Sequence, residues 1–339
     1  MGRDRHVFHK SGPDHLTHVD WGDAVHRRSV AACLVQATYV LEHDRRNNCG
    51  QHNALAPAWW QFFGFQLLEK LSDGGDSFFG AVFKLERSSL PAPAYVVAFR
   101  GTITTCFEDL KHNIHLFLHK LHNSCRTKVA VEAVRSRIAP AGSVSGGGGA
   151  GVWLAGHSLG SSVAMAVGKA LATEGVFLES FLFNPPYLSL PLHIIKNQNV
   201  KNMLEITNII GKSVIVFVAE TFGDSSVAAL FEIISGWVPS LFVNPSDVIC
   251  AEYIEYFKVR ERMAENELGF VRRTFARASI SATILTICGE ETAALHLLPS
   301  AELHVSSCAT SDRIADHSIE QWWRSDLVVT SKRYHYHSE

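Results

Sequence analysis

Stretches with the apolar spacing of helices alternate along this chain with short apolar runs that are typical of strands. Residues 24–41 carry apolar side chains at helical spacing, which predicts a helix there. Several runs predict strands: FFGAVFKLE, AYVVAFRG, VWLA, FLESFLFNPP, PSLFVNPSD and AELHVSS. Helical patterns follow some of them, over residues 104–122, from about 250 to 278 and in DHSIEQWW. This alternation predicts an α/β fold with a mostly parallel sheet covered by helices on both faces.

No linker-like break divides the chain, so we expect a single domain over residues 15–333. Residues 1–14 are polar and rich in histidine and are expected to be poorly ordered, and residues 334–339 form a polar tail. The run PAGSVSGGGGAG predicts a flexible loop over residues 140–150.

A dense aromatic cluster follows the first predicted helix. The stretch APAWWQFFGFQLLEKL contains Trp59, Trp60, Phe62 and Phe63, and Pro57 is typical of the first turn of a helix. Four side chains of this size cannot all face water, so we expect an aromatic layer that packs an N-terminal helical region onto the sheet. We prefer this interpretation to a platform for stacking a cofactor.

The region from 188 to 237 allows two interpretations. Its last apolar positions have the spacing of an amphipathic helix: Val227, Leu230, Phe231 and Ile234. In a hydrolase such a segment forms a cap or lid over the site, whereas in any α/β protein it can be a plain helix packed on the sheet. The pattern does not separate the two.

The motif that carries most information is Gly-His-Ser-Leu-Gly, which stands between the strand-like VWLA and a helical pattern rich in small residues. Such a turn forces Ser158 into a strained backbone conformation and presents its hydroxyl. Gly156 and Gly160 have no Cβ to collide with the adjoining strand and helix. We therefore expect a nucleophile elbow in which His157 precedes and Leu159 follows the nucleophile Ser158. A strand-to-helix turn whose serine only caps the helix is the alternative.

A serine hydroxyl is a poor nucleophile at neutral pH, so it needs a base, and the base needs an acid that orients it. In hydrolases with this elbow the order along the chain is Ser, acid, His. The histidines after Ser158 are His193, His296, His304, His317, His335 and His337. His317 follows the last predicted strand and precedes the predicted helix SIEQWW, so a loop can carry it to the elbow. We assign His317 as the base and expect His296 and His304 to pack among their apolar neighbours.

The acid is assigned by its place at the end of a strand. Asp247 follows the run SLFVN at the carboxyl edge, where open parallel sheets build their sites. Asp224 is the second candidate, but no predicted strand leads to it, and Asp312 and Asp316 are expected to be solvated loop charges. The sequence thus predicts the triad Ser158, Asp247 and His317.

An oxyanion that develops during ester cleavage needs two hydrogen-bond donors aimed at one point. The backbone N–H of Leu159, directly after the nucleophile, is one candidate. The run AFRGT supplies the other, because Gly101 permits close approach and Thr102 offers an amide and a hydroxyl. An ordinary turn at the end of the strand is the alternative interpretation of this run.

Composition narrows the range of partners. The 31 basic and 33 acidic residues give a net charge of −2, which leaves no electrostatic footprint for nucleic acid or an anionic membrane. The 7 cysteines include no Cys-x-x-Cys pair, which argues against a disulfide framework and a structural zinc site. No apolar run reaches the roughly 20 residues of a membrane span, and the first residues lack a secretory signal, so we expect a cytoplasmic protein.

A histidine-rich segment offers a competing site. The four side chains share one face if the segment is helical: His112, His115, His119 and His122. Such spacing can build a metal site, but the sequence shows no nearby thiolate or evident supporting groups. We therefore expect a polar helix face and no metal or other cofactor.

Several motifs together resemble the class 3, fungal-type lipases, in the right order along nearly the whole chain: VVAFRGT, AGHSLGSS, FNPP, FVNPSD and DHSIEQWW. Within that group the chain is similar to a plant branch often labelled GDSL esterase/lipase-like, although it carries Gly-His-Ser-Leu-Gly and no Gly-Asp-Ser-Leu. The resemblance implies an α/β-hydrolase fold, the roles assigned above to Ser158, Asp247 and His317, and Thr102 as an oxyanion donor. The chain departs from that branch at Ser318, because a glycine is more usual directly after the histidine that corresponds to His317.

These residues predict a serine carboxylester hydrolase, of the triacylglycerol lipase or carboxylesterase type, that cleaves acyl esters, in the first place of lipids. Its partners are then a lipid or small ester substrate and, transiently, a lipid surface. An α/β-hydrolase-fold protein that binds a ligand or partner without catalysis is the alternative, and acyl transfer to an alcohol uses the same residues. Because an imidazole must be neutral to accept a proton, we expect activity to rise with pH through roughly 6 to 7.

Overall fold

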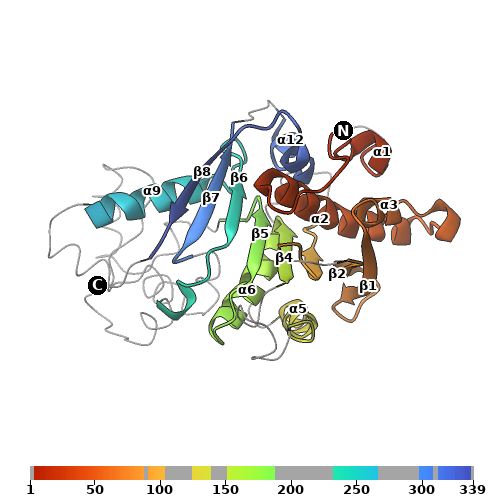
Figure 1. Cartoon of the computed structure of the whole chain (residues 1–339), viewed down its shortest axis with the longest axis horizontal. Coiled ribbons are helices and arrows are strands. Elements are labelled where there is room, and N and C mark those ends of the chain that lie inside the picture. The colour runs from red at the N-terminus through yellow and green to blue at the C-terminus, as the bar shows by residue number, and fades with distance from the viewer. Residues whose placement is uncertain are drawn as a thin grey trace, which may run out of the picture.

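An eight-stranded sheet runs through the centre of the protein (Figure 1). The structure is a computed structural model that describes residues 4–87, 91–103, 124–138, 151–187, 232–265, 298–307 and 312–336. The strands lie side by side in chain order: β1 (Phe65–Ser72), β2 (Phe78–Leu85), β3 (Tyr95–Phe99), β4 (Val152–His157), β5 (Glu179–Phe183), β6 (Ser240–Val243), β7 (Ala301–Ser306) and β8 (Val329–Tyr334). The strands from β3 to β7 pair in parallel, and β1, β2 and β8 join antiparallel at the edges. The expected α/β architecture with a mostly parallel sheet is confirmed.

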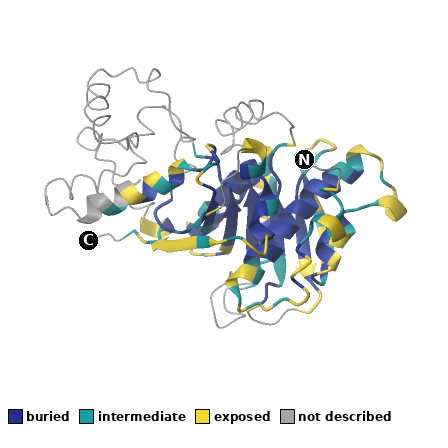
Figure 2. Ribbon diagram, turned by 90° about the horizontal axis from the view of Figure 1, so that it is seen from above, coloured by how far each residue is buried: buried dark blue, intermediate teal, exposed yellow. Residues whose placement is uncertain are grey.

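Helices cover both faces of this sheet, as the alternating pattern predicts. One face carries α2 (Ala24–Arg46), α3 (Pro57–Gln61) and the 3-10 helix η4 (Ile319–Trp323). The other face carries α5 (Cys125–Arg135), α6 (Leu159–Ala172) and α9 (Glu252–Glu265). Shorter elements complete the described chain: α1 (Phe8–Ser11), η1 (Gln51–Asn53) and α12 (Arg313–Asp316). Figure 2 shows the buried residues concentrated in the sheet and in the helix faces against it.

The central strand β4 shows why its sequence is apolar without a break. Trp153 and Ala155 point into the core on the α2 side, whereas Val152 and Leu154 join the core on the α6 side. A strand covered on both faces buries every side chain, so it has no polar alternation. Helix α2 is also buried along most of its length. Asp23 caps its first turn by accepting hydrogen bonds from the amides of Val25 and His26.

The sequence patterns did not predict the two edge strands or α5. β1 lies in the stretch interpreted as a continuation of the aromatic cluster, where α3 ends at Gln61 and Gly64 turns the chain at φ 74°. β8 reads VTSKRY and exposes most of its side chains. Edge strands face water on one side and at one edge, so their sequences carry a weak apolar signal.

The aromatic cluster packs largely as expected. Trp59, Trp60 and Phe63 are buried in the core between α2, α3 and the sheet, whereas Phe62 is 51% exposed. Phe8 in α1 lies edge-on to Trp59, with ring centroids 4.9 Å apart. Residues 4–14, for which the sequence predicts little order, are thus tied to the core by an aromatic side chain within a polar segment.

Several predicted features fall outside the described residues. These are the loop over residues 140–150, the helical segment over residues 104–122 with its four histidines, and most of the region from 188 to 237. Of that region residues 232–237 are described, and Trp237 packs against Gly168 of α6, where an added Cβ would meet the indole ring. Within the described ranges, no helix has the length and apolar composition needed to cross a membrane.

The turn between β4 and α6 has the strained geometry that the motif predicts. Ser158 adopts φ 55° and ψ −128°, a backbone region that residues other than glycine rarely occupy. A Cβ at Gly156 would lie 2.5 Å from the carbonyl oxygen of Gly160, and a Cβ at Gly160 would lie even closer to the carbonyl oxygen of Phe99. Close packing of the helix start against β3 and β4 therefore leaves the turn no relaxed alternative.

The backbone strain at Ser158 should lower the free energy of unfolding, which can be measured. Because glycine tolerates the backbone angles of Ser158, we expect Ser158→Gly to unfold with a free energy about 1 kcal/mol higher than Ser158→Ala. The same pair at Ser162, inside α6, is the control, and there glycine should be less stable than alanine by about 0.5–1 kcal/mol. Urea unfolding of the four variants measures both differences, and the same order at both positions would contradict the strain.

A buried carboxylate ties α2 to the sheet. The Glu42 side chain accepts hydrogen bonds from Arg45, Arg46, the Ser77 hydroxyl and the Phe78 amide, at 2.8–3.1 Å. Burial alone would raise the pKa of Glu42, but these donors outweigh it and lower the pKa from 4.5 to about 2. The ionised carboxylate therefore stabilises the folded state.

Glu42→Gln should reduce the free energy of unfolding by about 1–3 kcal/mol at neutral pH, because buried donors lose a charged acceptor. The stabilisation from Glu42 is complete above its ordinary pKa of 4.5 and is lost as the pH falls toward about 2, so the difference between the two proteins should shrink on acidification. Urea unfolding between pH 7 and 3 tests this. Glu174→Gln, which removes an exposed ion pair with Arg135, is the control and should change stability by less than about 1 kcal/mol.

Candidate active site

Two of the predicted site residues meet directly. Asp247 follows β6, His317 follows α12, and His317 Nδ1 lies 2.7 Å from Asp247 Oδ2. Both side chains are buried, with 1% of Asp247 and 6% of His317 exposed. A neutral or protonated imidazole donates this Nδ1 hydrogen to the carboxylate, so the proton-accepting position of His317 is Nε2.

Asp247 is held as a carboxylate. Burial tends to raise its pKa, but the charge and hydrogen bond of His317 and the donors Asn184 and Ile249 outweigh burial, and the net shift is downward. Asn184 Nδ2 donates to Asp247 Oδ2 at 2.8 Å, and the Ile249 amide donates to Oδ1 at 3.1 Å. The acid therefore stays negative through the neutral range and can stabilise an imidazolium.

The backbone on either side of His317 is fixed by buried side chains. Gln321 Nε2 donates to the carbonyl oxygens of Asp316 and Ser318, at 2.8 and 2.9 Å. His157 Nε2 lies 2.7 Å from the carbonyl oxygen of His317 itself. Ser318 has φ −69°, which any residue adopts, and its hydroxyl caps η4 by accepting from the Glu320 amide. A glycine is therefore not needed after the histidine.

The structure does not join Ser158 and His317, the two residues between which a triad reaction transfers a proton, by a hydrogen bond. Ser158 Oγ and His317 Nε2 are buried and form no hydrogen bond within the described parts of the chain. Ser158 lies at the start of α6, and its amide donates to the carbonyl oxygen of Phe183 at the end of β5. It has no exposed surface, whereas the motif predicts a hydroxyl that is presented to a substrate.

A directed chain of hydrogen bonds runs beneath the candidate nucleophile. Since a carbonyl oxygen only accepts, His157 Nε2 carries the hydrogen that it shares with the carbonyl of His317. His157 Nδ1 must then accept, at 2.8 Å, from the hydroxyl of Tyr39, which in turn accepts from the Gly101 amide at 2.7 Å. Burial lowers the pKa of His157 well below its ordinary value and raises that of Tyr39 to about 12, so both stay neutral.

This chain reaches the loop that was predicted to hold the oxyanion. A Cβ at Gly101 would lie 2.8 Å from Ser158 Cβ, so the loop after β3 does lie against the elbow. Because the Gly101 amide donates to Tyr39, it is not available to a ligand, and Thr102 stays the predicted oxyanion donor of this run. Arg100 fixes the loop by donating to the carbonyl oxygens of Phe78 and Gly101, at 2.6 and 2.7 Å. Leu159 stands at the first position of α6, as expected.

Some of the other candidate acids and bases have a different place in the structure, and the rest lie outside the described residues. His304 stacks on Phe242, and its Nδ1 is 2.7 Å from the hydroxyl of Ser331. Asp312 caps α12 by accepting from the Ile314 amide, and Asp316 is buried, unlike the solvated charge that was expected. His335 follows β8, and the remaining alternatives are outside the described residues: His193, Asp224, His296 and His337.

Sequence reasoning missed Tyr39, Asn184 and Gln321, which support the site through buried hydrogen bonds. Tyr39 lies among apolar helix positions, and Gln321 lies beside two tryptophans, so each looks like a part of the core. Asn184 ends β5, in the motif FNPP, and a polar residue at the carboxyl end of a buried strand was the available signal. Among the residues that the structure describes, no group of three or more histidine, cysteine or acidic side chains is arranged to hold a metal ion.

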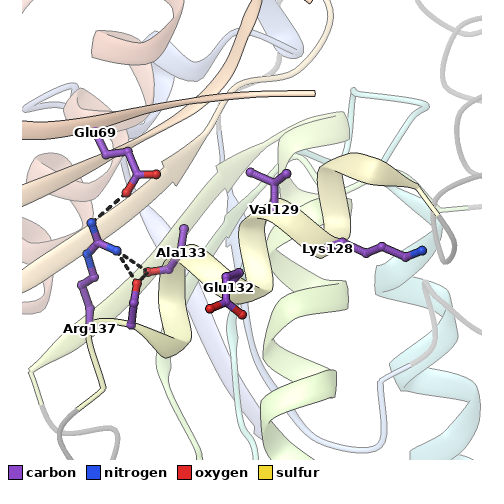
Figure 3. A pocket seen from close by; sticks show the side chains of 7 residues that line it. Glu69, Lys128, Val129, Glu132, Ala133 and Arg137 are labelled. Atoms are coloured by element: carbon purple, nitrogen blue, oxygen red, sulfur yellow. Dashed lines mark hydrogen bonds and ion pairs between the residues drawn. The ribbon is translucent and has the colours of Figure 1, made fainter. Parts of the chain in front are cut away.

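A surface hollow of about 370 Å³ lies away from this site, between α5 and β1 (Figure 3). It is lined by Glu69, Lys128, Val129, Glu132, Ala133, Ser136 and Arg137. Arg137 and Glu69 form an ion pair of 2.7 Å at its edge. None of the candidate site residues lines this hollow, so it carries no part of the predicted chemistry.

Comparison with known proteins identifies a relative of the whole chain. The chain is 38% identical over 358 aligned residues to an Arabidopsis thaliana protein named GDSL esterase/lipase, and the alignment covers 99% of each protein. No model of a protein family matches the chain, and no solved structure matches it.

This finding corrects the family suggested by the motifs. The assignment to the class 3, fungal-type lipases was wrong, because the full-length relative is named for the GDSL esterases and lipases, a distinct family. The motifs behind the assignment form strand ends and an elbow, and such local geometry recurs in serine hydrolases of different descent. Identity along the full length is the stronger criterion, and it shows that this chain belongs to the GDSL esterase/lipase family.

Proposed function

We propose that the chain is a serine carboxylester hydrolase of the α/β-hydrolase type that cleaves acyl esters, in the first place those of lipids. The name of the relative, esterase/lipase, supports ester substrates. The elbow between β4 and α6 and the chain order Ser158, Asp247, His317 support the hydrolase type. We further propose that it works in the cytoplasm.

The observation that carries the proposal is the pairing within the site. His317 Nδ1 lies 2.7 Å from Asp247 Oδ2, while His317 Nε2 and Ser158 Oγ form no hydrogen bond, either with each other or with another described residue. Most buried polar atoms are paired, so an imidazole bound to a carboxylate and a serine hydroxyl, each with its reactive atom unpaired, support the interpretation that these groups are kept free for a reaction.

In the proposed reaction His317 Nε2 takes the proton of Ser158 as Oγ attacks the ester carbonyl carbon. Asp247 stays ionised and stabilises the imidazolium. The amides of Leu159 and Thr102 donate to the oxyanion, and collapse of the tetrahedral adduct expels the alcohol with the proton returned by His317. Water then attacks the acyl-enzyme in the same way, which releases the acid and restores Ser158.

A fluorophosphonate probe combined with turnover of p-nitrophenyl esters tests the nucleophile. We expect the wild type to be labelled and to hydrolyse the esters, and Ser158→Ala to lose the label and at least about 1,000-fold in kcat. Ser162→Ala, on the next turn of α6, is the matched control and should keep both. The dependence on acyl chain length then distinguishes an esterase from a lipase.

No labelling of well-folded wild type, in the presence and absence of a lipid surface, would contradict the proposal. The protein would then fit the alternative function, binding of a ligand or partner without catalysis.

The pH dependence tests the base. Among the titratable side chains packed at the site, Asp247 and His157 have lowered pKa values, and Tyr39 and Cys250 have raised ones, so none of these changes charge near neutrality. We therefore expect kcat/KM to rise with pH as a single ionisation, because the base must lose its proton before it can accept one from Ser158. A flat profile between about pH 5 and 9 would exclude His317 as the base.

A further inference from the structure

The Asp247 carboxylate is held by more than the imidazole. Among the described residues, its Oδ2 receives three side-chain contacts: His317 Nδ1 at 2.7 Å, Asn184 Nδ2 at 2.8 Å and Cys250 Sγ at 3.2 Å. Its Oδ1 accepts from one backbone amide, that of Ile249. Two donors other than the base therefore converge on the oxygen that the base uses.

The orientation of the Asn184 amide follows from its other partner. Trp322 Nε1 can only donate, and it lies 2.6 Å from Asn184 Oδ1, so the amide nitrogen must face Asp247. Asn184 Nδ2 also lies 3.3 Å from the carbonyl oxygen of Asp316, the residue before His317. With φ 44° and no exposed surface, the asparagine is fixed in a left-handed conformation between β5, the acid and the segment of the base.

Cys250 supplies the second donor. It is fully buried, and burial beside Asp247 raises the pKa of its thiol well above the ordinary value, so the sulfur keeps its hydrogen. The Cys250 amide also bonds to the carbonyl of Asp247, which places the thiol on the same turn as the acid.

We propose that Asn184 and Cys250 are positioning residues that hold Asp247 Oδ2 toward His317 Nδ1 and so set the basicity of the imidazole. This inference rests on the proposed function, because it assigns a role within the proposed triad. With a donor removed, the carboxylate is free to rotate away from the imidazole, which then loses part of the negative charge that stabilises the imidazolium.

Asn184→Gly and Cys250→Ala remove the two donors separately, and each has a matched control. Glycine is tolerated at φ 44°, and Asn48→Gly makes the same change at φ 51° on the surface. Cys33→Ala makes the same change in the buried face of α2. Three properties are measured for the full chain: kcat and KM, the pH profile of kcat/KM, and the far-downfield proton signal of His317 Nδ1–H, identified by its absence from His317→Asn.

We expect Asn184→Gly to lower kcat about 10- to 100-fold, the usual effect of removing a group that orients a reactive one, with KM within about twofold. Its acid limb should move to lower pH by up to about one unit, because the imidazolium loses its counter-charge, and the downfield signal should weaken or disappear. Cys250→Ala should change the same properties in the same direction but less, because a thiol is a weak donor. The two controls should match the wild type within about twofold.

Wild-type kcat and an unchanged downfield signal in Asn184→Gly would overturn the proposal, as would a loss of kcat that is uniform in pH with the signal intact. The proton signal needs no substrate, so it decides the proposal even if the wild type hydrolyses no ester, and its absence from the wild type would also overturn it. An active wild type with an inactive Ser158→Ala and a normal Asn184→Gly would refute this inference alone and leave the hydrolase proposal standing.

Discussion

The close approach of α6 to the sheet at Gly156 and Gly160 is the constraint on which the rest of the site depends. With no room for a Cβ at either position, the chain passes from β4 into the helix through one strained residue, Ser158. Its amide is bound to the end of β5 and its Cβ lies against the loop after β3. A turn that is overdetermined in this way can keep a conformation that a serine would otherwise leave.

Buried hydrogen bonds transmit this constraint to the other parts of the site. Tyr39 and His157 connect the loop at Gly101 to the backbone of His317, and Asn184 connects the end of β5 to Asp247. In a water-poor interior an unsatisfied polar group is costly, so each satisfied link also fixes the relative position of two segments far apart in the sequence. These hydrogen bonds link the segments at the carboxyl edge of the sheet, while Ser158 Oγ and His317 Nε2 have no hydrogen-bond partner among the described residues.

The sequence predicted the central strands and the helical patterns because burial on both faces gives an unbroken apolar run, as in β4. It did not predict β1 and β8, because an edge strand such as VTSKRY has little apolar surface to bury. At the site, spacing brought out Ser158, Asp247 and His317 as candidates. It could not bring out Tyr39 or Gln321, since Tyr39 bonds to Gly101 across 62 positions and Gln321 bonds to Asn244 across 77, and no local pattern encodes such contacts.

The family assignment shows the same limit of local reasoning from another side. An elbow needs glycines around its serine for steric reasons, and an acid and a base need strand ends for topological reasons, whatever the descent of the protein. Motifs that arise from these steric and topological requirements indicate a kind of site and not a line of descent. Here they resembled a lipase family to which the chain does not belong. The residues that surround the triad are less constrained by the reaction. Asn184, whose amide is oriented by Trp322, and Cys250, whose thiol meets the acid, are particular solutions to the common problem of holding a buried carboxylate.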